Sequence, residues 1–384
     1  MKVTGTNKRK LNTGVVFFYV INFFVLISFS KFHTNPIYHI INSVLTIMLF
    51  LYWGLTYIEH RIKLTTINIL SLLYLVCIYG YSIYIGSLQG FSDPFIVITL
   101  ILFICYAFTH HPRELFVAAL IFYVFFGVWQ FYLEITYSYV DEFEVTENWL
   151  VENKNVVVRY FLPGMMFTLL NSNCNNYGLL SYKTVVPLTL LATTIIMSTS
   201  ATGIIGTLLF LFFAFLFKNK MPQRLTINAF LILTMASFAL ILFYNVQENF
   251  TQYLELFGKD ATLSNRTEVW FFAVEQFLRN PILGNGVGSV IEGANPLMEF
   301  HHAHNYWLEA LRATGLIGTG MLLTIYVISS NNFKKQGNGN ASTRLFVITI
   351  ITFLIMGIDE SLTNAYMLIP ILNLSGVKGV NKVK

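Results

Sequence analysis

The side chains best suited to chemistry lie in one stretch of the chain, between Arg266 and Gly318. It holds three closely spaced histidines, His301, His302 and His304. A histidine can act as a general base near neutral pH, because its pKa lies close to that pH. We expect His304 to be the base. The alternative for all three is a polar position beside aromatic residues at the membrane interface.

Four charged residues are candidates for contact with substrate. Arg266 and Arg159 are basic residues in otherwise acidic surroundings, and the planar guanidinium group suits bidentate recognition of phosphate. The alternative for each is an ion pair with a nearby carboxylate. Glu309 and Arg312 are three residues apart and would share one face of a helix. Charges inside a membrane usually face the bundle interior or a wet cavity, so this pair either contacts substrate or neutralises itself.

Motifs for several other kinds of chemistry are missing from the sequence. It has no glycine-rich phosphate loop ending in Lys-Ser or Lys-Thr, and no Asp-x-Asp pair. No cluster of Cys and His has the spacing of metal ligands, and Cys77, Cys105 and Cys174 are too far apart to suggest a disulfide framework. We therefore expect no metal, no other cofactor and no ATP-driven transport within this chain.

The elements that position these residues are predicted from the composition, which is typical of an integral membrane protein. Of 384 residues, 55% are hydrophobic and 11% are charged, whereas soluble domains carry roughly 25% charged residues. Apolar segments long enough to cross a bilayer must be helices, because lipid cannot satisfy an exposed strand edge. We predict an all-α transmembrane bundle of about twelve helices, over residues 14–30, 37–58, 65–85, 94–109, 115–137, 160–180, 184–199, 203–217, 225–244, 305–328, 345–358 and 365–377.

The distribution of charge predicts the orientation of this bundle. With the N-terminus in the cytoplasm, the inner segments hold 17 of the 24 Lys and Arg residues and only two of the 19 Asp and Glu residues. This pattern satisfies the positive-inside rule, and an even number of helices places the C-terminus in the cytoplasm as well. The net charge of +5 therefore reflects topology and does not indicate binding to nucleic acid.

We predict a single membrane domain, residues 1–384, with two long outer loops. The first, 138–159, is acidic, and the second, 245–304, is too long to be a simple connector. Within the second loop, residues 268–278 place apolar side chains on one helical face. This pattern predicts an amphipathic helix at the membrane surface, whose role is either lipid contact or substrate contact.

Several short motifs in the C-terminal half resemble the O-antigen polymerase and ligase superfamily, whose members are often called Wzy-like. The motifs are Arg266-Thr-Glu-Val-Trp270, Asn280-Pro-Ile-Leu-Gly-Asn-Gly-Val-Gly288, His304-Asn305 followed by Gly315-x-x-Gly318, and Asp359-Glu360-Ser361. One position departs from the family pattern, since Ala201 stands where many relatives carry an arginine. Arg159 is a candidate to replace that arginine.

The resemblance implies transfer of a glycan from an undecaprenyl-diphosphate-linked donor at the outer face of the cytoplasmic (inner) membrane, without nucleotide or metal. His304 would deprotonate the acceptor hydroxyl. Arg266, with Arg159 as a second cation, would stabilise the charge that develops on the diphosphate. Further substrate contacts are predicted for Asn305, Glu309, Arg312, Trp270, Gly284 and Gly286.

Three functions remain open from the sequence. The leading one is a polymerase that joins lipid-linked repeat units of O-antigen, capsule or exopolysaccharide, with a chain-length regulator and a flippase as partners. The second is a ligase that uses the same donor and a different acceptor, such as lipid A-core. The third is a transporter of lipid-linked glycan, which would show broken helices near the midplane and would not need a long outer loop.

Overall fold

The structure is a computed structural model that describes residues 10–27, 35–87, 93–137, 150–151, 153–222, 226–244, 266–292, 299–337, 340–362 and 366–377. Most of the predicted acidic loop 138–159 lies outside the described residues. The same holds for residues 245–265 and 293–298 of the second predicted outer loop.

The described residues form an all-α bundle, which confirms the predicted fold class. Twelve of the helices in these ranges coincide with the predicted spanning segments, and the thirteenth, α12, matches the predicted amphipathic helix. The helices are α1 (Thr13–Leu26), α3 (Pro36–Glu59), α4 (Thr66–Tyr84), α5 (Asp93–His110), α6 (Pro112–Thr136), α7 (Val157–Cys174), α8 (Tyr182–Met197), α9 (Ala201–Leu216), α10 (Ile227–Tyr244), α12 (Arg266–Arg279), α13 (Tyr306–Gln336), α14 (Ala341–Met356) and α15 (Leu368–Asn373).

The last predicted segment, 365–377, is shorter in the structure than its apolar composition suggests. It forms the six-residue helix α15 and a 3-10 turn, η2 (Leu374–Gly376). At 1.5 Å per residue, α15 is about 9 Å long and cannot cross a hydrocarbon core of about 30 Å as a helix. In contrast α3, α4, α6 and α13 are each long and apolar enough to do so.

Polar side chains at the helix starts fix where the helices begin. Asn35 accepts hydrogen bonds from the first backbone amides of α3, and Thr65 forms a reciprocal capping box with Asn68 at α4. The side chains of Asn305 and Asn340 likewise accept hydrogen bonds from backbone amides in the first turns of α13 and α14. Such caps satisfy amides that have no partner within the helix, which matters most where lipid offers none.

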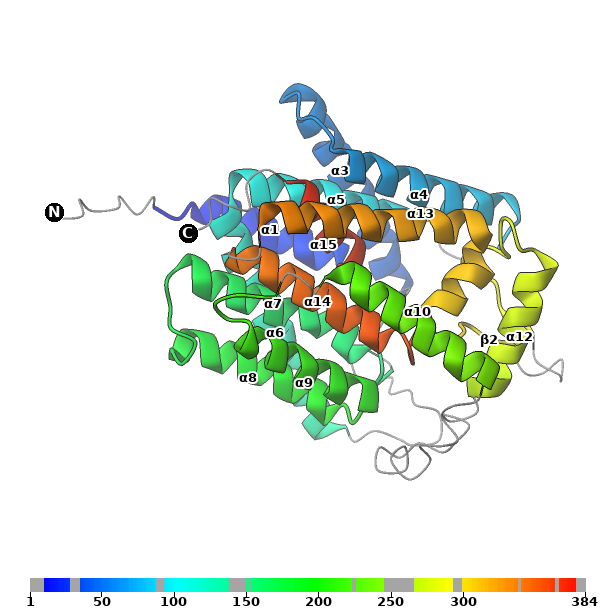
Figure 1. The fold of residues 1–384 in the computed structure, drawn as a ribbon. Helices are drawn as coiled ribbons and strands as arrows, with labels where there is room; N and C mark the ends of the chain where they lie inside the picture. The colour runs from blue at the N-terminus through cyan, green and yellow to red at the C-terminus, as the bar shows by residue number, and fades with distance from the viewer. Residues whose placement is uncertain are drawn as a thin grey trace.

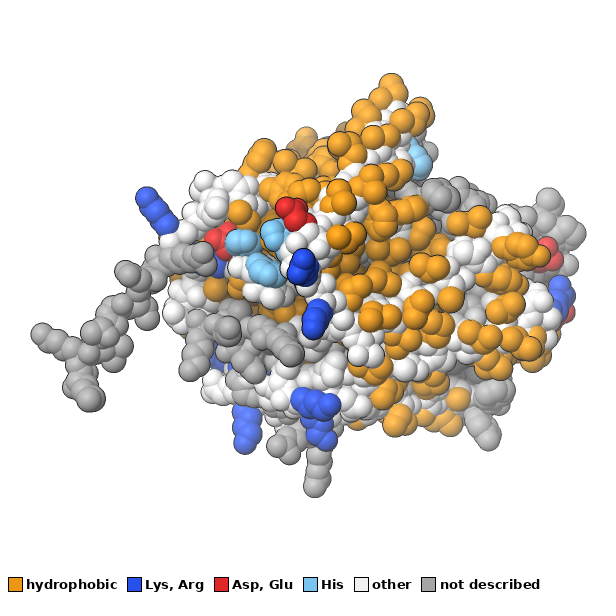
Figure 2. Space-filling model, turned by 90° about the horizontal axis from the view of Figure 1, so that it is seen from above, with side chains coloured by type: hydrophobic (Ala, Val, Ile, Leu, Met, Phe, Trp, Pro, Cys, Tyr) orange, Lys and Arg blue, Asp and Glu red, His pale blue; other side chains and the backbone are white. Residues whose placement is uncertain are grey.

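Most helices run lengthwise beside one another, and α12 lies at one end of the bundle together with a short hairpin (Figure 1). The hairpin pairs β1 (Ile291–Glu292) with β2 (Glu299–Phe300). Viewed from the side of α3, α4 and α13, the surface is a broad hydrophobic band with charged and histidine side chains towards its ends (Figure 2). On α3 alone, Ile37, Met48 and Ile58 are 68%, 60% and 74% exposed. An apolar surface of this extent is typical of a protein surrounded by lipid.

Helix α13 has a kink that anchors the loop before it. Gly315 has φ 61° and ψ −167°, a conformation essentially confined to glycine. The kink frees backbone groups of α13, and the preceding loop pairs with them. Leu316 N donates to Pro281 O at 2.8 Å, and Gly286 N donates to Ala313 O at 2.9 Å. A Cβ on Gly284 would lie 2.6 Å from the Ala313 backbone, so the loop can dock only with glycine there.

We expect Gly315→Ala to destabilise the protein by more than about 1–3 kcal/mol, because backbone strain and a collision with the Ile282 carbonyl act together. Gly320→Ala, on the same helix, is the matched control, since nothing lies within 4 Å of its Cβ position. That change should be neutral or stabilise by up to about 1 kcal/mol. Thermal unfolding in detergent measures both, and equal midpoints would contradict the docking role.

Candidate active site

The centre of the site is the carboxylate of Glu360, which lies just after α14. Its Oε2 is 2.7 Å from Arg159 Nη2 of α7, and its Oε1 is 2.9 Å from Arg266 Nη2 at the start of α12. The three side chains are 1%, 2% and 6% exposed, respectively. One buried carboxylate therefore holds two arginines that are far apart in the sequence.

A second carboxylate completes the cluster. Asp359 Oδ1 lies 2.6 Å from Arg266 Nη1, which also donates to the Asp359 carbonyl. Asp359 Oδ2 accepts a hydrogen bond from Thr202 Oγ1 of α9 at 3.3 Å. Thr202 is adjacent in the sequence to Ala201, the position at which the family resemblance predicts an arginine. The two carboxylates balance the charges of Arg159 and Arg266, which reduces the cost of burying them.

The cluster shifts the ionisation of its members. Burial would raise the pKa of the Glu360 carboxyl, but Arg266, the His304 ring and Arg159 together hold it well below its usual range. For Arg266, burial acts to lower the pKa, and the carboxylates of Glu360 and Asp359 raise it above its ordinary value. Both groups are therefore charged at any physiological pH.

His304 lies beside this cluster in an unusual backbone conformation. Its φ is 48°, in the left-handed region, and its Nδ1 is 3.9 Å from Glu360 Oε2. Within the described residues this Nδ1 has no hydrogen-bond partner, and the side chain is 26% exposed. The ring of His302 is centred 4.5 Å from that of His304. Burial, together with the nearby His304 and Arg159 side chains, lowers the pKa of His302 to about 3, so His302 is neutral.

The backbone on both sides of His304 is held by side chains. The amide of Ala303 donates to Glu309 Oε2 at 2.8 Å, and its carbonyl accepts from Trp270 Nε1 at 2.8 Å. On the other side, Asn305 Nδ2 donates to the carbonyl of Ile358 at 2.7 Å. These bonds compensate for the unfavourable φ of His304 and fix the direction of its ring.

The structure thus brings Arg159, Arg266, Asn305 and His304 together at one end of the bundle. Trp270 was predicted to contact substrate, but it is 2% exposed and its N–H donates to the Ala303 carbonyl. This burial favours a positioning role.

Glu309 and Arg312 form a buried ion pair, with Arg312 Nη2 2.6 Å from Glu309 Oε1. Arg312 also donates to the carbonyl and hydroxyl of Ser289. These contacts favour the alternative in which Glu309 and Arg312 neutralise each other and do not contact substrate. Gly284 and Gly286 lie against the α13 kink and near Ser87, respectively, so their contacts are with protein backbone and side chains. Among the residues that can be described, no three His, Cys, Asp or Glu side chains converge as metal ligands.

Asp359 and Glu360 belong to a family-like motif, but their pairing with the two arginines was not predicted from the sequence. An available signal was an acidic pair directly after an apolar segment, on the predicted outer side of the membrane. Charges at such a boundary need partners, and Arg159 and Arg266 of the predicted outer loops are basic residues that could supply them. Glu360 lies 201 residues from Arg159 and 94 residues from Arg266 in the sequence, so no local pattern reveals these ion pairs.

We expect Glu360→Gln to destabilise the protein by about 3–5 kcal/mol, because it leaves the buried Arg159 without a countercharge and removes one of the two carboxylates that pair with Arg266. Glu275→Gln is the control, since the Glu275–Arg279 pair is 47% and 60% exposed and contributes at most about 0.5 kcal/mol. The pKa of Glu360 is lowered in the folded state, so its contribution is present above the ordinary Glu pKa and is lost only in stronger acid. Chemical unfolding should therefore show the same difference between wild type and Glu360→Gln from pH 8 to about pH 5. Equal stability of the two chains would contradict the central role of Glu360.

Two comparisons with known proteins place the chain near a described family. Residues 186–323 match the family model described as O-antigen ligase, a range that includes Arg266 and His304 but neither Arg159 nor Glu360. The chain is also 35% identical over 89 residues to the exopolysaccharide production protein ExoQ of Rhizobium meliloti (strain 1021), and this alignment covers 20% of each chain. The chain thus aligns with about a fifth of that relative's length. These matches confirm the resemblance to the O-antigen polymerase and ligase superfamily that the motifs between Arg266 and Gly318 predict.

Proposed function

We propose that this membrane protein is a polysaccharide polymerase that joins oligosaccharide repeat units carried on undecaprenyl diphosphate. The observation that carries the proposal is the convergence of His304, Arg159 and Arg266 on Glu360 at the predicted outer end of the bundle. A base and two fixed cations are what glycosyl transfer from a lipid diphosphate requires. The family match supports a function of the O-antigen ligase or polymerase type.

In the proposed reaction, an acceptor hydroxyl attacks the anomeric carbon of the donor glycan. A new C–O bond forms to the acceptor oxygen, and the bond from the anomeric carbon to the diphosphate oxygen breaks. The electron pair of that bond stays on the diphosphate, and the hydroxyl proton passes to His304. The atoms and charges balance without a metal or a nucleotide.

The orientation of His304 suits the role of base. Its Nδ1 faces the Glu360 carboxylate, which favours the tautomer with the proton on Nδ1 and leaves the lone pair on Nε2. The 3.9 Å separation is longer than a hydrogen bond, and such contacts tighten when substrate closes a site. Nε2 is then the atom that accepts the proton from the acceptor.

The arginines are the proposed site for the diphosphate. Arg159 Nε is buried and has no hydrogen-bond partner among the described residues, so one donor remains available. Arg266 is occupied by Glu360 and Asp359, of which Asp359 is the more accessible at 30% exposure. A phosphate oxygen can replace the Asp359 carboxylate on Arg266 while Glu360 stays in place. Arg159 would then supply the second cation that Ala201 does not.

Two other functions are kept as alternatives. A ligase would use the same site and donate the glycan to a different acceptor, such as lipid A-core. A transporter of lipid-linked glycan would not need a base beside the arginines. The name of the matched relative, an exopolysaccharide production protein, favours polymer formation. Under this proposal the protein acts at the outer face of the cytoplasmic membrane, with both termini in the cytoplasm, beside a flippase and a chain-length regulator.

The proposal is tested by reconstitution in lipid vesicles with lipid-linked repeat units, followed by separation of the products by size. We expect a ladder of lengthened glycans from the wild-type protein and none from His304→Ala or Arg266→Ala. A loss of about 10²–10⁴-fold in rate is expected for removal of the base. His301→Ala is the control, because His301 is an exposed histidine of the same segment.

The products of this assay distinguish the polymerase from the two alternative functions. A full ladder from both folded variants would overturn the assigned roles. Glycan that changes leaflet and never lengthens would favour the transporter, and a single addition to an unrelated acceptor would favour the ligase.

The displacement of Asp359 by phosphate predicts a gain in affinity when its charge is removed. We expect Asp359→Asn to lower the KM for the diphosphate-linked donor several-fold, since the substrate no longer competes with a carboxylate for Arg266. Steady-state kinetics at fixed acceptor concentration measures this change. An unchanged or increased KM in a stable Asp359→Asn protein would show that the aspartate is not displaced.

A further inference from the structure

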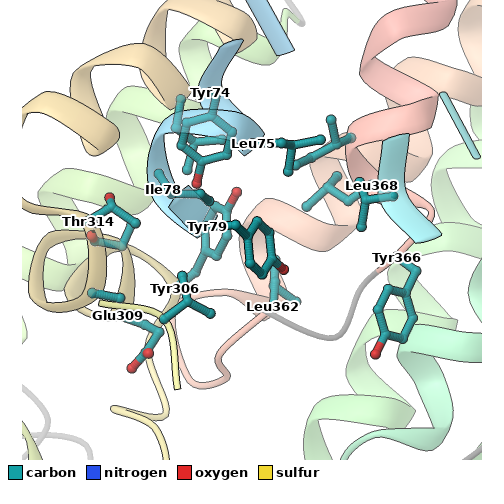
Figure 3. Close-up of a pocket in the computed structure, with 16 residues that line it drawn as sticks. Tyr74, Leu75, Ile78, Tyr79, Tyr306, Glu309, Thr314, Leu362, Tyr366 and Leu368 are labelled. Atoms are coloured by element: carbon teal, nitrogen blue, oxygen red, sulfur yellow. Dashed lines mark hydrogen bonds between the residues drawn. The ribbon is translucent and has the colours of Figure 1, made fainter. Parts of the chain in front are cut away.

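A cavity of about 140 Å³ lies between α4, α5, α13 and α15. Figure 3 shows aromatic side chains from different elements around it, with Tyr74 and Tyr79 on α4, Tyr306 on α13 and Tyr366 just before α15. Aliphatic side chains complete most of the wall that the described residues form, among them Leu75, Leu362, Leu368 and Ile369. The cavity is therefore a mainly hydrocarbon and aromatic space inside the bundle.

The cavity adjoins the candidate active site through two segments. Tyr306 is two residues beyond His304, and Leu362 is two residues beyond Glu360. Glu309 also lies on the wall, and its carboxylate is held by Arg312 and the Ala303 amide. A molecule bound to Arg159 and Arg266 would thus have this cavity next to its charged end, on the side of the bundle interior.

The size and lining of the cavity limit what it can take. An apolar cavity of about 150 Å³ binds a molecule of the size of benzene, so this one has room for about five or six carbon atoms. Two polar side chains of the wall already have partners, since Glu309 pairs with Arg312 and Thr314 Oγ1 donates to the Ala310 carbonyl. A sugar ring would bring several hydroxyl groups against a mostly apolar wall, which is unfavourable without matched hydrogen bonds. A branched five-carbon hydrocarbon unit meets both limits.

We propose that this cavity binds the isoprene unit of the polyprenyl carrier that is nearest to the diphosphate. This inference rests on the proposed function, because it assumes that a polyprenyl diphosphate binds at the arginines. Its consequence is that the protein selects its donor by the branched hydrocarbon next to the diphosphate as well as by charge. The cavity also fixes where the anomeric carbon lies relative to His304.

The test compares two donors that carry the same glycan diphosphate. One has a polyprenyl chain, and the other has a linear saturated alkyl chain that lacks the methyl branch. Ala310 lines the cavity, so Ala310→Leu fills part of it. We expect this change to raise the KM for the polyprenyl donor about tenfold or more and the KM for the narrower, unbranched alkyl donor by much less. Ala236→Leu, at an exposed position of α10, is the matched control and should alter neither value.

The outcomes separate this inference from the proposed function. Turnover of the alkyl donor by Ala310→Leu shows that the variant is folded, and an unchanged KM for the polyprenyl donor then overturns the inference alone. If the wild-type protein turns over neither donor, the proposed function is overturned. If Ala310→Leu does not fold, Leu75→Val replaces it, and a rise of about two- to tenfold in the polyprenyl KM alone supports the cavity's role. A change confined to glycan preference would identify a sugar site instead.

Discussion

The ion pairs of Glu360 determine how the end of the bundle that holds the candidate active site is built. A buried carboxylate without a countercharge is very unfavourable, and so is a buried guanidinium group. Glu360 satisfies both constraints at once by pairing with Arg159 and Arg266. Because these residues belong to the segment after α14, to α7 and to α12, the pairs fix three separate elements relative to one another. The cluster is also where a substrate anion would meet the protein.

Helix α12 links this cluster to the histidine segment. Arg266 is its first residue, and Trp270 follows four residues later, so both side chains lie on the same helical face. Arg266 binds the carboxylates, while the indole of Trp270 holds the carbonyl of Ala303 beside His304. The Arg-x-x-x-Trp motif therefore sets the distance between a cation and the proposed base through one rigid turn of helix.

The helices could be predicted from the sequence, but the contacts between them could not. Apolar length located the helices, and the apolar face of residues 268–278 identified α12, because both signals are local. The brevity of α15 was not predictable from apolar composition. Likewise, the glycine-rich turn was read as a possible ligand site, whereas the structure docks it against the kink at Gly315. That contact depends on the path of α13, which no spacing within the turn encodes.

The sequence separation within the central cluster has a consequence for how the protein is made. Glu360 is synthesised 201 residues after Arg159 and 94 residues after Arg266. At translation rates of about 5–20 residues per second, Arg159 exists for about 10–40 s before its countercharge is made. Until then, α7 begins with an unpaired guanidinium group that water or lipid phosphate must solvate. The ion pairs that join α7 and α12 to the segment after α14 can therefore form only once α14 and Glu360 have been synthesised.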